Sequence, residues 1–240
     1  MSYVWQSAEQ THRGNKRKNN EDSVLSRPDV GLWAVADGMG GHMAGDVASR
    51  AITDALARVS LEGPLADDVD RVEDALLSVN DELRLHSRTR CQGGTVGSTV
   101  VVLLTAGEVG VVLWAGDSRL YRLRSGRLEQ VTRDHNPVSD LLDAGVVSEK
   151  DALAADTNII TRAVGGQANL TLDVAVFDVS RGDTLLLCSD GLYREMDDAA
   201  LTRVLSGERL DEVVSRLLTR CLAGAARDNV SLVVARPRLP

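Results

Sequence analysis

Three apolar segments of this chain end at an aspartate that neighbours a glycine. The aspartates are Asp37, Asp117 and Asp190, and the apolar runs before them are 32–36, 111–115 and 185–188. Runs of this kind, bounded by glycine, are typical of buried strands, and an aspartate at the end of one lies at the rim of the sheet, within reach of a cation. A single Asp-Gly pair is an ordinary turn signal. Three such pairs, each after a core strand, indicate a shared site.

Further carboxylates accompany these three. Glu21 and Asp22 are adjacent in the sequence, and Asp228 precedes the last apolar run. Carboxylates at the ends of neighbouring strands repel one another unless a cation lies between them. Because oxygen ligands favour hard divalent ions, the sequence predicts a site for Mg²⁺, Mn²⁺ or Ca²⁺ rather than zinc.

A basic cluster, residues 16–18, lies just before Glu21. Such a cluster is often a solvated loop. Beside a cation site, however, Arg17 could bind a phosphate dianion, because a guanidinium pairs bidentately with phosphate oxygens while carboxylates hold the metal. Both interpretations of Arg17 stay open at this point.

Composition sets the outer bounds. The 240 residues are 43% hydrophobic and 26% charged, which is typical of a soluble globular protein with one full core. A net charge of −8 argues against a nucleic-acid surface. The three cysteines form no CxxC pair, which fits a reducing compartment and excludes a thiolate metal site. With no leader and no long apolar run, we expect no signal peptide, no membrane span and a cytoplasmic location.

The elements that must position these residues alternate between strands and helix pairs. Helical spacing of apolar residues predicts helices at 44–60, 68–87, 198–205 and 210–222. Strands are predicted at 3–8, 23–26, 31–37, 98–104, 109–115, 120–123, 128–131, 172–179, 184–189 and 229–235, with 93–97 as a loop. The short spacing of the central strands favours an antiparallel meander, so we expect an α+β fold of two packed antiparallel sheets with a helix pair outside each.

The segment 132–166 interrupts the meander. Helical fragments are predicted at 138–144 and 148–155. The segment is interpreted either as a lid over one end of the sheet or as a plain connector.

Six short motifs in order resemble the metal-dependent PPM (PP2C-type) protein phosphatases, in particular their bacterial single-domain branch. They are RKNNED at 17–22, VADGMGG at 35–41, AGDSR at 115–119, ITRAVG at 160–165, SDG at 189–191 and RDN at 227–229. The resemblance implies a four-layer αββα sandwich, one catalytic domain over 1–240 with a flap-like insertion at about 132–166. It also implies hydrolysis of phosphoserine and phosphothreonine by a water that bridges two Mn²⁺ or Mg²⁺ ions.

The resemblance also implies roles for individual residues. Asp37 would bridge the two ions, Glu21 and the Gly38 carbonyl would complete one ion's protein ligands, and Asp190 and Asp228 would hold the other. Asp22 would hydrogen-bond a metal-bound water, and Arg17 would bind the phosphate. Asp117, together with Asp190, matches the position of a possible third metal. Arg17, Asp37 and Asp190 are thus the predicted catalytic residues.

Two places depart from the family pattern. Eukaryotic members have a histidine, proposed as the general acid, where this chain has Met39, and a thioether cannot donate that proton. His42 could take over this role or cap the helix that follows. Residues 154–157 replace the His-Pro and basic residues that relatives have, so no substrate contact is carried over from their flaps. His135 matches the pattern and is interpreted as structural.

Two other functions compete with this one. A catalytically inactive binding module should have lost a ligand, yet Glu21, Asp37, Asp190 and Asp228 are all present. A phosphoesterase for small molecules would use the same metals and is not excluded. We expect a monomer that acts on phosphoproteins, opposes a Ser/Thr kinase and binds neither nucleic acid nor membrane.

Overall fold

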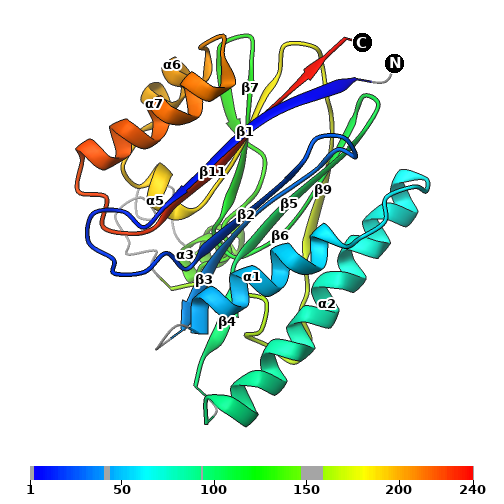
Figure 1. Cartoon of the computed structure of the whole chain (residues 1–240), viewed down its shortest axis with the longest axis vertical. Helices are drawn as coiled ribbons and strands as arrows, with labels where there is room; N and C mark the ends of the chain where they lie inside the picture. The colour runs from blue at the N-terminus through cyan, green and yellow to red at the C-terminus, as the bar shows by residue number, and fades with distance from the viewer. Residues whose placement is uncertain (1–2, 41–43, 93, 147–158, 240) are drawn as a thin grey trace.

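The computed structural model describes residues 3–40, 44–92, 94–146 and 159–239 of the chain. Two antiparallel sheets lie face to face, with helices on both outer sides (Figure 1). The predicted fold class, an α+β sandwich of two antiparallel sheets flanked by helices, is confirmed.

The first sheet has five strands and the second has six. In the first, the spatial order is β1 (Val4–His12), β11 (Val230–Arg238), β10 (Thr184–Cys188), β7 (Arg119–Arg124) and β8 (Arg127–Gln130). In the second, it is β2 (Asp22–Arg27), β3 (Leu32–Gly40), β5 (Val100–Ala106), β6 (Val109–Ala115) and β9 (Asp173–Asp178), and the short β4 (Val96–Ser98) pairs with the far end of β3. In Figure 1 the two terminal strands, β1 and β11, run side by side toward the N and C labels.

Helices cover the outer face of each sheet. The six-stranded sheet is covered by α1 (Ala44–Ala57) and α2 (Leu65–Arg90), and the five-stranded sheet by α6 (Asp198–Leu205) and α7 (Leu210–Ala223). Two short helices, α3 (Pro137–Asp143) and α5 (Asp190–Tyr193), follow strands. In the part of the chain that the structure describes, no helix combines the length and the apolar character needed to cross a bilayer.

Alternation along the central strands creates three apolar layers. On β3, Leu32 and Ala34 pack against α1 and α2, whereas Trp33 faces the other sheet. On β10, Leu186 packs against the helices and Leu187 lies between the sheets. Because successive side chains of a strand point to opposite faces, both faces of a strand can be buried only when the sheet is covered on both sides. The four-layer arrangement follows directly from these apolar runs.

Antiparallel pairing brings distant carboxylates to one end of the sandwich. Asp22, at the start of β2, lies opposite Asp37 on β3, and Cys188, at the end of β10, lies opposite Arg119 at the start of β7. The same end also contains the start of β11, where Val230 pairs with His12. Strand ends that are up to about 200 residues apart in sequence therefore converge there, as the Asp-Gly pattern predicts.

The predicted end of β3 is wrong. The sequence places the strand end at Asp37 and a loop at 93–97, but β3 continues to Gly40, because Gly38, Met39 and Gly40 pair with Ser98, Gly97 and Val96 of β4. Asp37 is thus held inside a paired strand. A pairing partner that is about 60 residues away leaves no local signal.

Other boundaries also differ. The terminal strands are longer than predicted, with β1 reaching His12 and β11 reaching Arg238, since the two strands pair along nine positions. The helix α2 extends beyond 68–87 at both ends. Asp190 begins a four-residue helix that the sequence pattern does not predict. The predicted fragment 148–155 and the middle of the 132–166 segment lie outside the described residues.

Candidate functional site

A cavity of about 500 Å³ opens at the end of the sandwich where the carboxylates meet. Seven of the predicted site residues line it, namely Arg17, Glu21, Asp37, Gly38, Asp117, Asp190 and Asp228. Asp22 is not among its lining residues and is almost fully buried. Met39 lines the cavity, whereas His42 lies outside the described residues. The structure therefore brings together in one cavity every described residue that the sequence predicts for the site except Asp22.

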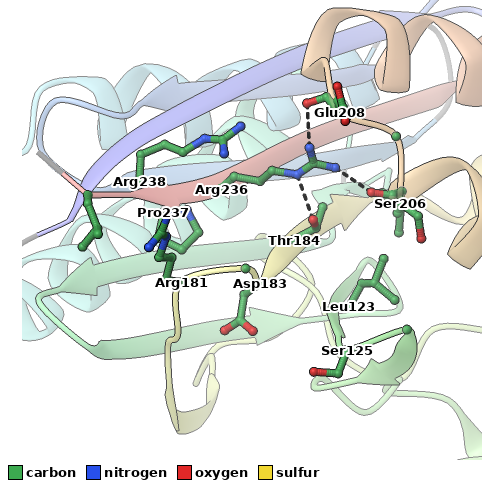
Figure 2. Close-up of a pocket in the computed structure, with 15 residues that line it drawn as sticks. Leu123, Ser125, Arg181, Asp183, Thr184, Ser206, Glu208, Arg236, Pro237 and Arg238 are labelled. Carbon is green, nitrogen blue, oxygen red and sulfur yellow. Dashed lines mark hydrogen bonds between the residues drawn. The ribbon is translucent and has the colours of Figure 1, made fainter.

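A larger cavity, of about 780 Å³, lies at the opposite end of the sandwich (Figure 2). There Arg236 donates hydrogen bonds to the Thr184 hydroxyl at 2.8 Å and to the carbonyls of Glu208 at 2.9 Å and Leu205 at 2.6 Å. None of the residues that line this cavity has a buried polar side-chain atom without a hydrogen-bond partner. Its polar groups tie β11 to the connection between α6 and α7, so we do not take it as the functional site.

Backbone contacts fix Asp37 and Gly38 in the smaller cavity. The Asp37 N–H donates to the Thr99 hydroxyl at 3.2 Å, and the Gly38 N–H donates to the Glu21 carbonyl at 3.1 Å. A Cβ atom at Gly38 would lie 2.1 Å from the Gly45 carbonyl oxygen, closer than atoms can approach. Residue 38 must therefore be glycine for α1 to pack this close to the acidic strands.

Asn229 holds the loop that contains Arg17 and Glu21. Its side-chain oxygen accepts a hydrogen bond from the Glu21 N–H at 2.8 Å, and its amide donates to the carbonyls of Arg13 at 3.0 Å and Asn19 at 2.9 Å. The residue is almost fully buried. The sequence motif at 227–229 contains Asn229 but predicts no role for it, and the only signal is its place beside Asp228 at the start of a strand.

Two arginines pair with carboxylates in the cavity. Arg17 donates to Asp228 at 2.8 Å, with 55% of its own side chain exposed. Arg194, which the sequence pattern does not single out, lies 3.1 Å from Asp190 and 3.5 Å from Asp117. The basic residue Arg17 thus lines the cavity, in line with its interpretation as a phosphate ligand.

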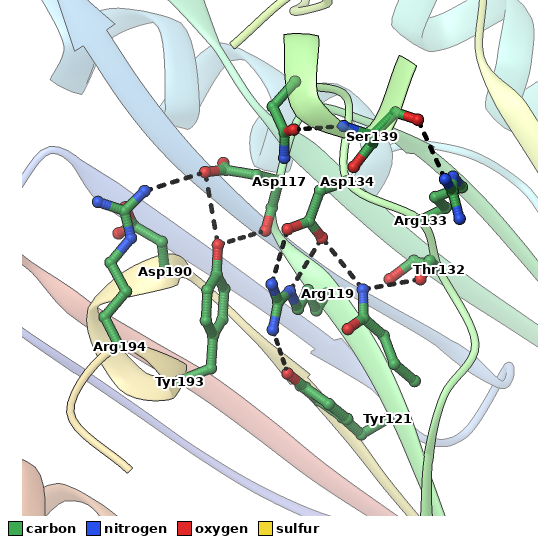
Figure 3. A network of polar contacts seen from close by, with 12 residues as sticks. Asp117, Arg119, Tyr121, Thr132, Arg133, Asp134, Ser139, Asp190, Tyr193 and Arg194 are labelled. Carbon is green, nitrogen blue, oxygen red and sulfur yellow. Dashed lines mark hydrogen bonds and ion pairs between the residues drawn. The ribbon is translucent and has the colours of Figure 1, made fainter. Parts of the chain in front are cut away.

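Aromatic and charged side chains support Asp117 from below (Figure 3). The Tyr193 hydroxyl donates to the Asp117 backbone carbonyl at 3.1 Å and lies 3.4 Å from its carboxylate. The guanidinium of Arg119 stacks on the Tyr193 ring at 3.6 Å and donates two hydrogen bonds to Asp134, at 2.9 and 2.7 Å. Because each group is held by the next, Asp117 has little freedom to turn away from the cavity.

His135 supports the same turn. Its Nδ1 accepts a hydrogen bond from the Gly116 N–H at 3.0 Å, and its ring stacks on Trp114. These contacts agree with the structural interpretation of His135.

The electrostatics of the cavity disfavour several negative charges at once. Burial is the largest cause, and it raises the pKa of Asp22 to about 7 and that of Asp117 to about 6. Burial and then the charges of Asp22, Asp190 and Asp117 raise the pKa of Asp37 well above its usual range. For Asp117 the nearby Asp190 is the next cause, and Arg194 opposes it. The carboxylates therefore lack sufficient counter-charge.

The donor set fits a hard divalent cation. One oxygen each of Asp22, Asp117 and Asp190 is buried without a hydrogen-bond partner, an unfavourable state that a bound cation would relieve. Within the described residues, no three His, Cys, Asp or Glu side chains are already grouped so that they could hold an ion. Asp228 contacts Arg17 and would exchange this arginine for the metal. Asp190 contacts Arg194 through Oδ2 and keeps Oδ1 for an ion.

Comparison with known proteins places this geometry in context. The sequence profile described as Protein phosphatase 2C matches residues 1–141. The chain is 34% identical over 236 residues to the serine/threonine protein phosphatase PstP of Mycobacterium tuberculosis, covering 98% of this chain and 45% of PstP. The chain thus spans less than half the length of that relative. It is 33% identical to the serine/threonine phosphatase stp of Listeria innocua, covering 95% of this chain and 94% of the relative.

Solved structures share the whole fold. PppA, described as a key regulatory component of T6SS in Pseudomonas aeruginosa, is 42% identical with a TM-score of 0.90, and the match covers 99% of both chains. The catalytic domain of serine threonine protein phosphatase PstP, solved in complex with two manganese ions, is 34% identical with a TM-score of 0.86 and covers 98% of this chain and 99% of its own.

The raised pKa of Asp22 predicts a pH dependence of stability in the metal-free protein. Between pH 4 and 7 the folded state keeps a proton on Asp22 that the unfolded chain has already lost, because the folded pKa is about 7 against an ordinary 3.8. Folding therefore loses stability as pH rises through this range, by at most about 1.4 kcal/mol per pH unit from this group. As pH rises from 4 to 7, the free energy of unfolding should therefore fall less in Asp22→Asn than in wild type.

Urea unfolding in chelator at pH 5 and pH 7 measures this difference. Asp29→Asn, in the exposed turn between β2 and β3, is the matched control and should keep the wild-type pH dependence. Equal pH dependence in Asp22→Asn and wild type would show that Asp22 does not hold a proton in the folded state.

Proposed function

Because the chain belongs to the protein phosphatase 2C family, we propose that it hydrolyses phosphoserine and phosphothreonine in proteins in a metal-dependent reaction. The observation that carries this proposal is the cavity in which Glu21, Asp37, Asp190 and Asp228 face Arg17. Acidic oxygens suited to divalent ions and a guanidinium suited to phosphate thus share one site.

The proposed metal ligands are the carboxylates of Glu21, Asp37, Asp190 and Asp228 and the Gly38 carbonyl, for two Mn²⁺ or Mg²⁺ ions. The two manganese ions of the related PstP structure support this number. When bound, such ions supply Lewis-acid activation of a water and of the phosphoryl oxygens. Asp22 accepts a hydrogen bond from the Ser189 hydroxyl at 2.9 Å, which fixes its carboxylate between the two sheets and behind the cavity.

Arg17 is the proposed phosphate ligand. Its guanidinium lies at the cavity on a loop that Asn229 holds in place, and more than half of the side chain is exposed to an incoming substrate. The pairing with Asp228 keeps it close to the metal ligands. Substrate binding would replace this single contact to Asp228 by phosphate oxygens, which can pair with a guanidinium bidentately.

The leaving alkoxide needs a proton, and Met39 has none to give although it lines the cavity. His42, for which the sequence allows either a general acid or a helix cap, lies outside the described residues.

Two alternatives are less well supported. A binding module without activity would not need the full set of carboxylates that face this cavity. A phosphoesterase for small molecules could use the same site, but the relatives described above are named as serine/threonine phosphatases, which favours a phosphoprotein substrate.

We further infer a regulatory setting. As a protein phosphatase, the chain would oppose a Ser/Thr kinase and act as a monomer in the cytoplasm. Its likeness to PppA, a key regulatory component of T6SS in Pseudomonas aeruginosa, supports a regulatory role. Residues 1–240 would form one catalytic domain, with 132–166 as its flap-like insertion.

Phosphate release from a phosphothreonine peptide tests the reaction. We expect release with Mn²⁺ or Mg²⁺ and none with chelator. Asp37→Ala and Asp190→Ala should each lower kcat at least about 100-fold, since each removes a proposed ligand and leaves the remaining carboxylates to repel. Asp29→Ala, in the exposed turn between β2 and β3, is the control and should keep wild-type kcat. Undiminished release in Asp190→Ala would refute the assigned site.

Substitution of Arg17 separates binding from chemistry. Arg17→Ala should raise KM about 10-fold or more and change kcat less, because the lost interaction is a charge-assisted hydrogen bond to phosphate. Arg17→Lys keeps the charge but loses the bidentate geometry, so its KM should lie between that of wild type and that of Arg17→Ala. Steady-state kinetics on the same peptide measure both constants, and an unchanged KM in Arg17→Ala would remove Arg17 from substrate binding.

A further inference from the structure

Arg194 joins two carboxylates that come from separate elements. Asp117 lies just after β6, and Asp190 is the first residue of α5. Arg194 follows α5 directly, one helical turn after Asp190. Its Nε lies 3.1 Å from Asp190 Oδ2, and its Nη2 lies 3.5 Å from Asp117 Oδ2 (Figure 3). Among the ion pairs of the described residues, this is the one guanidinium shared by these two aspartates.

This contact differs from an ordinary surface ion pair. The Asp117 side chain is 4% exposed and that of Asp190 is 11% exposed, and Arg194 meets one oxygen, Oδ2, of each. Two carboxylates this deeply buried demand a cation, because their charges are poorly screened by water. The Arg194 side chain is 36% exposed, so it reaches the pair from the cavity side.

Two other arginines of this region are already paired with other carboxylates, Arg17 with Asp228 and Arg119 with Asp134. Arg119 lies under the Tyr193 ring and gives both of its parallel hydrogen bonds to Asp134. Tyr193 approaches Asp117 only as a neutral hydroxyl donor. Burial raises the pKa of this hydroxyl above its usual range, so it stays protonated. The positive charge between Asp117 and Asp190 therefore comes from Arg194.

We propose that Arg194 is a tethered cation between Asp117 and Asp190 that takes the place of a further divalent ion there. This inference rests on the proposed function, because a further ion has meaning only if the other carboxylates of the cavity bind the two proposed metal ions. The family resemblance implies a third metal at Asp117, and the geometry points to an arginine of the chain itself instead. Asp117 then acts as a positioning residue that orients Arg194 beside Asp190.

Counting bound Mn²⁺ tests the proposal without a reaction. Equilibrium dialysis at matched free Mn²⁺, followed by metal analysis, gives ions per chain. Arg194→Gln should bind one more ion than wild type, because the two aspartates lose their cation. The double variant Arg194→Gln/Asp117→Asn should return to the wild-type number. Arg216→Gln, which removes another i,i+4 arginine pair on an exposed helix face, is the matched control and should equal wild type.

If Arg194→Gln does not fold, the number of Mn²⁺ ions bound by Asp117→Asn tests the proposal instead. Asp117→Asn alone should bind as many ions as wild type, since no ion depends on Asp117. Loss of an ion in Asp117→Asn, or no gain in a folded Arg194→Gln, would overturn the role of Arg194 while wild type still binds Mn²⁺. A wild type that binds no Mn²⁺ at all would instead overturn the proposed function, and this inference with it.

Discussion

Repulsion between buried carboxylates is the constraint on which this structure depends. Asp22 and Asp37 are paired directly across β2 and β3, and Asp117 and Asp190 approach from two other elements. Burial and these neighbouring charges raise the pKa values of all four. Such an arrangement is unfavourable on its own, so the remainder of the fold must hold it in place. A bound cation is the natural source of the missing charge.

The rigidity comes from apolar layers and a few polar links. The central strands are buried on both faces, which fixes the register and therefore the position of each strand end. Ser189 connects Asp22 to the other sheet, and Asn229 ties the loop of Arg17 and Glu21 to the start of β11. Arg17 and Arg194 then supply part of the counter-charge. Because Arg17 pairs with a proposed metal ligand, binding of metal at Asp228 and release of Arg17 toward phosphate would be coupled.

The sequence predicts well what local patterns encode. The apolar runs before Asp37, Asp117 and Asp190 predict both the buried strands and the convergence of their ends, and the 3.6-residue spacing predicts α6 and α7 to within one residue. Local sequence patterns do not predict features that depend on distant partners. The extension of β3 through Gly40 depends on β4, and the roles of Asn229 and Arg194 depend on side chains brought near by the fold. Neither a lone asparagine nor an arginine after a short helix has a signal of its own.

Thermal unfolding of wild type and Asp37→Asn, each in chelator and in saturating Mn²⁺, tests most directly whether carboxylate repulsion organises this end of the molecule. If it does, Asp37→Asn unfolds at a higher temperature than wild type in chelator at neutral pH, because the folded state no longer has to bury a repelling charge, or take up a proton to avoid one, at this position. In Mn²⁺ the order reverses, because wild type gains the full stabilisation of the bound ions. The claim that carboxylate repulsion organises this end would be contradicted by a lower unfolding temperature for Asp37→Asn than for wild type in chelator. An equal rise in unfolding temperature with Mn²⁺ in both proteins would also contradict it.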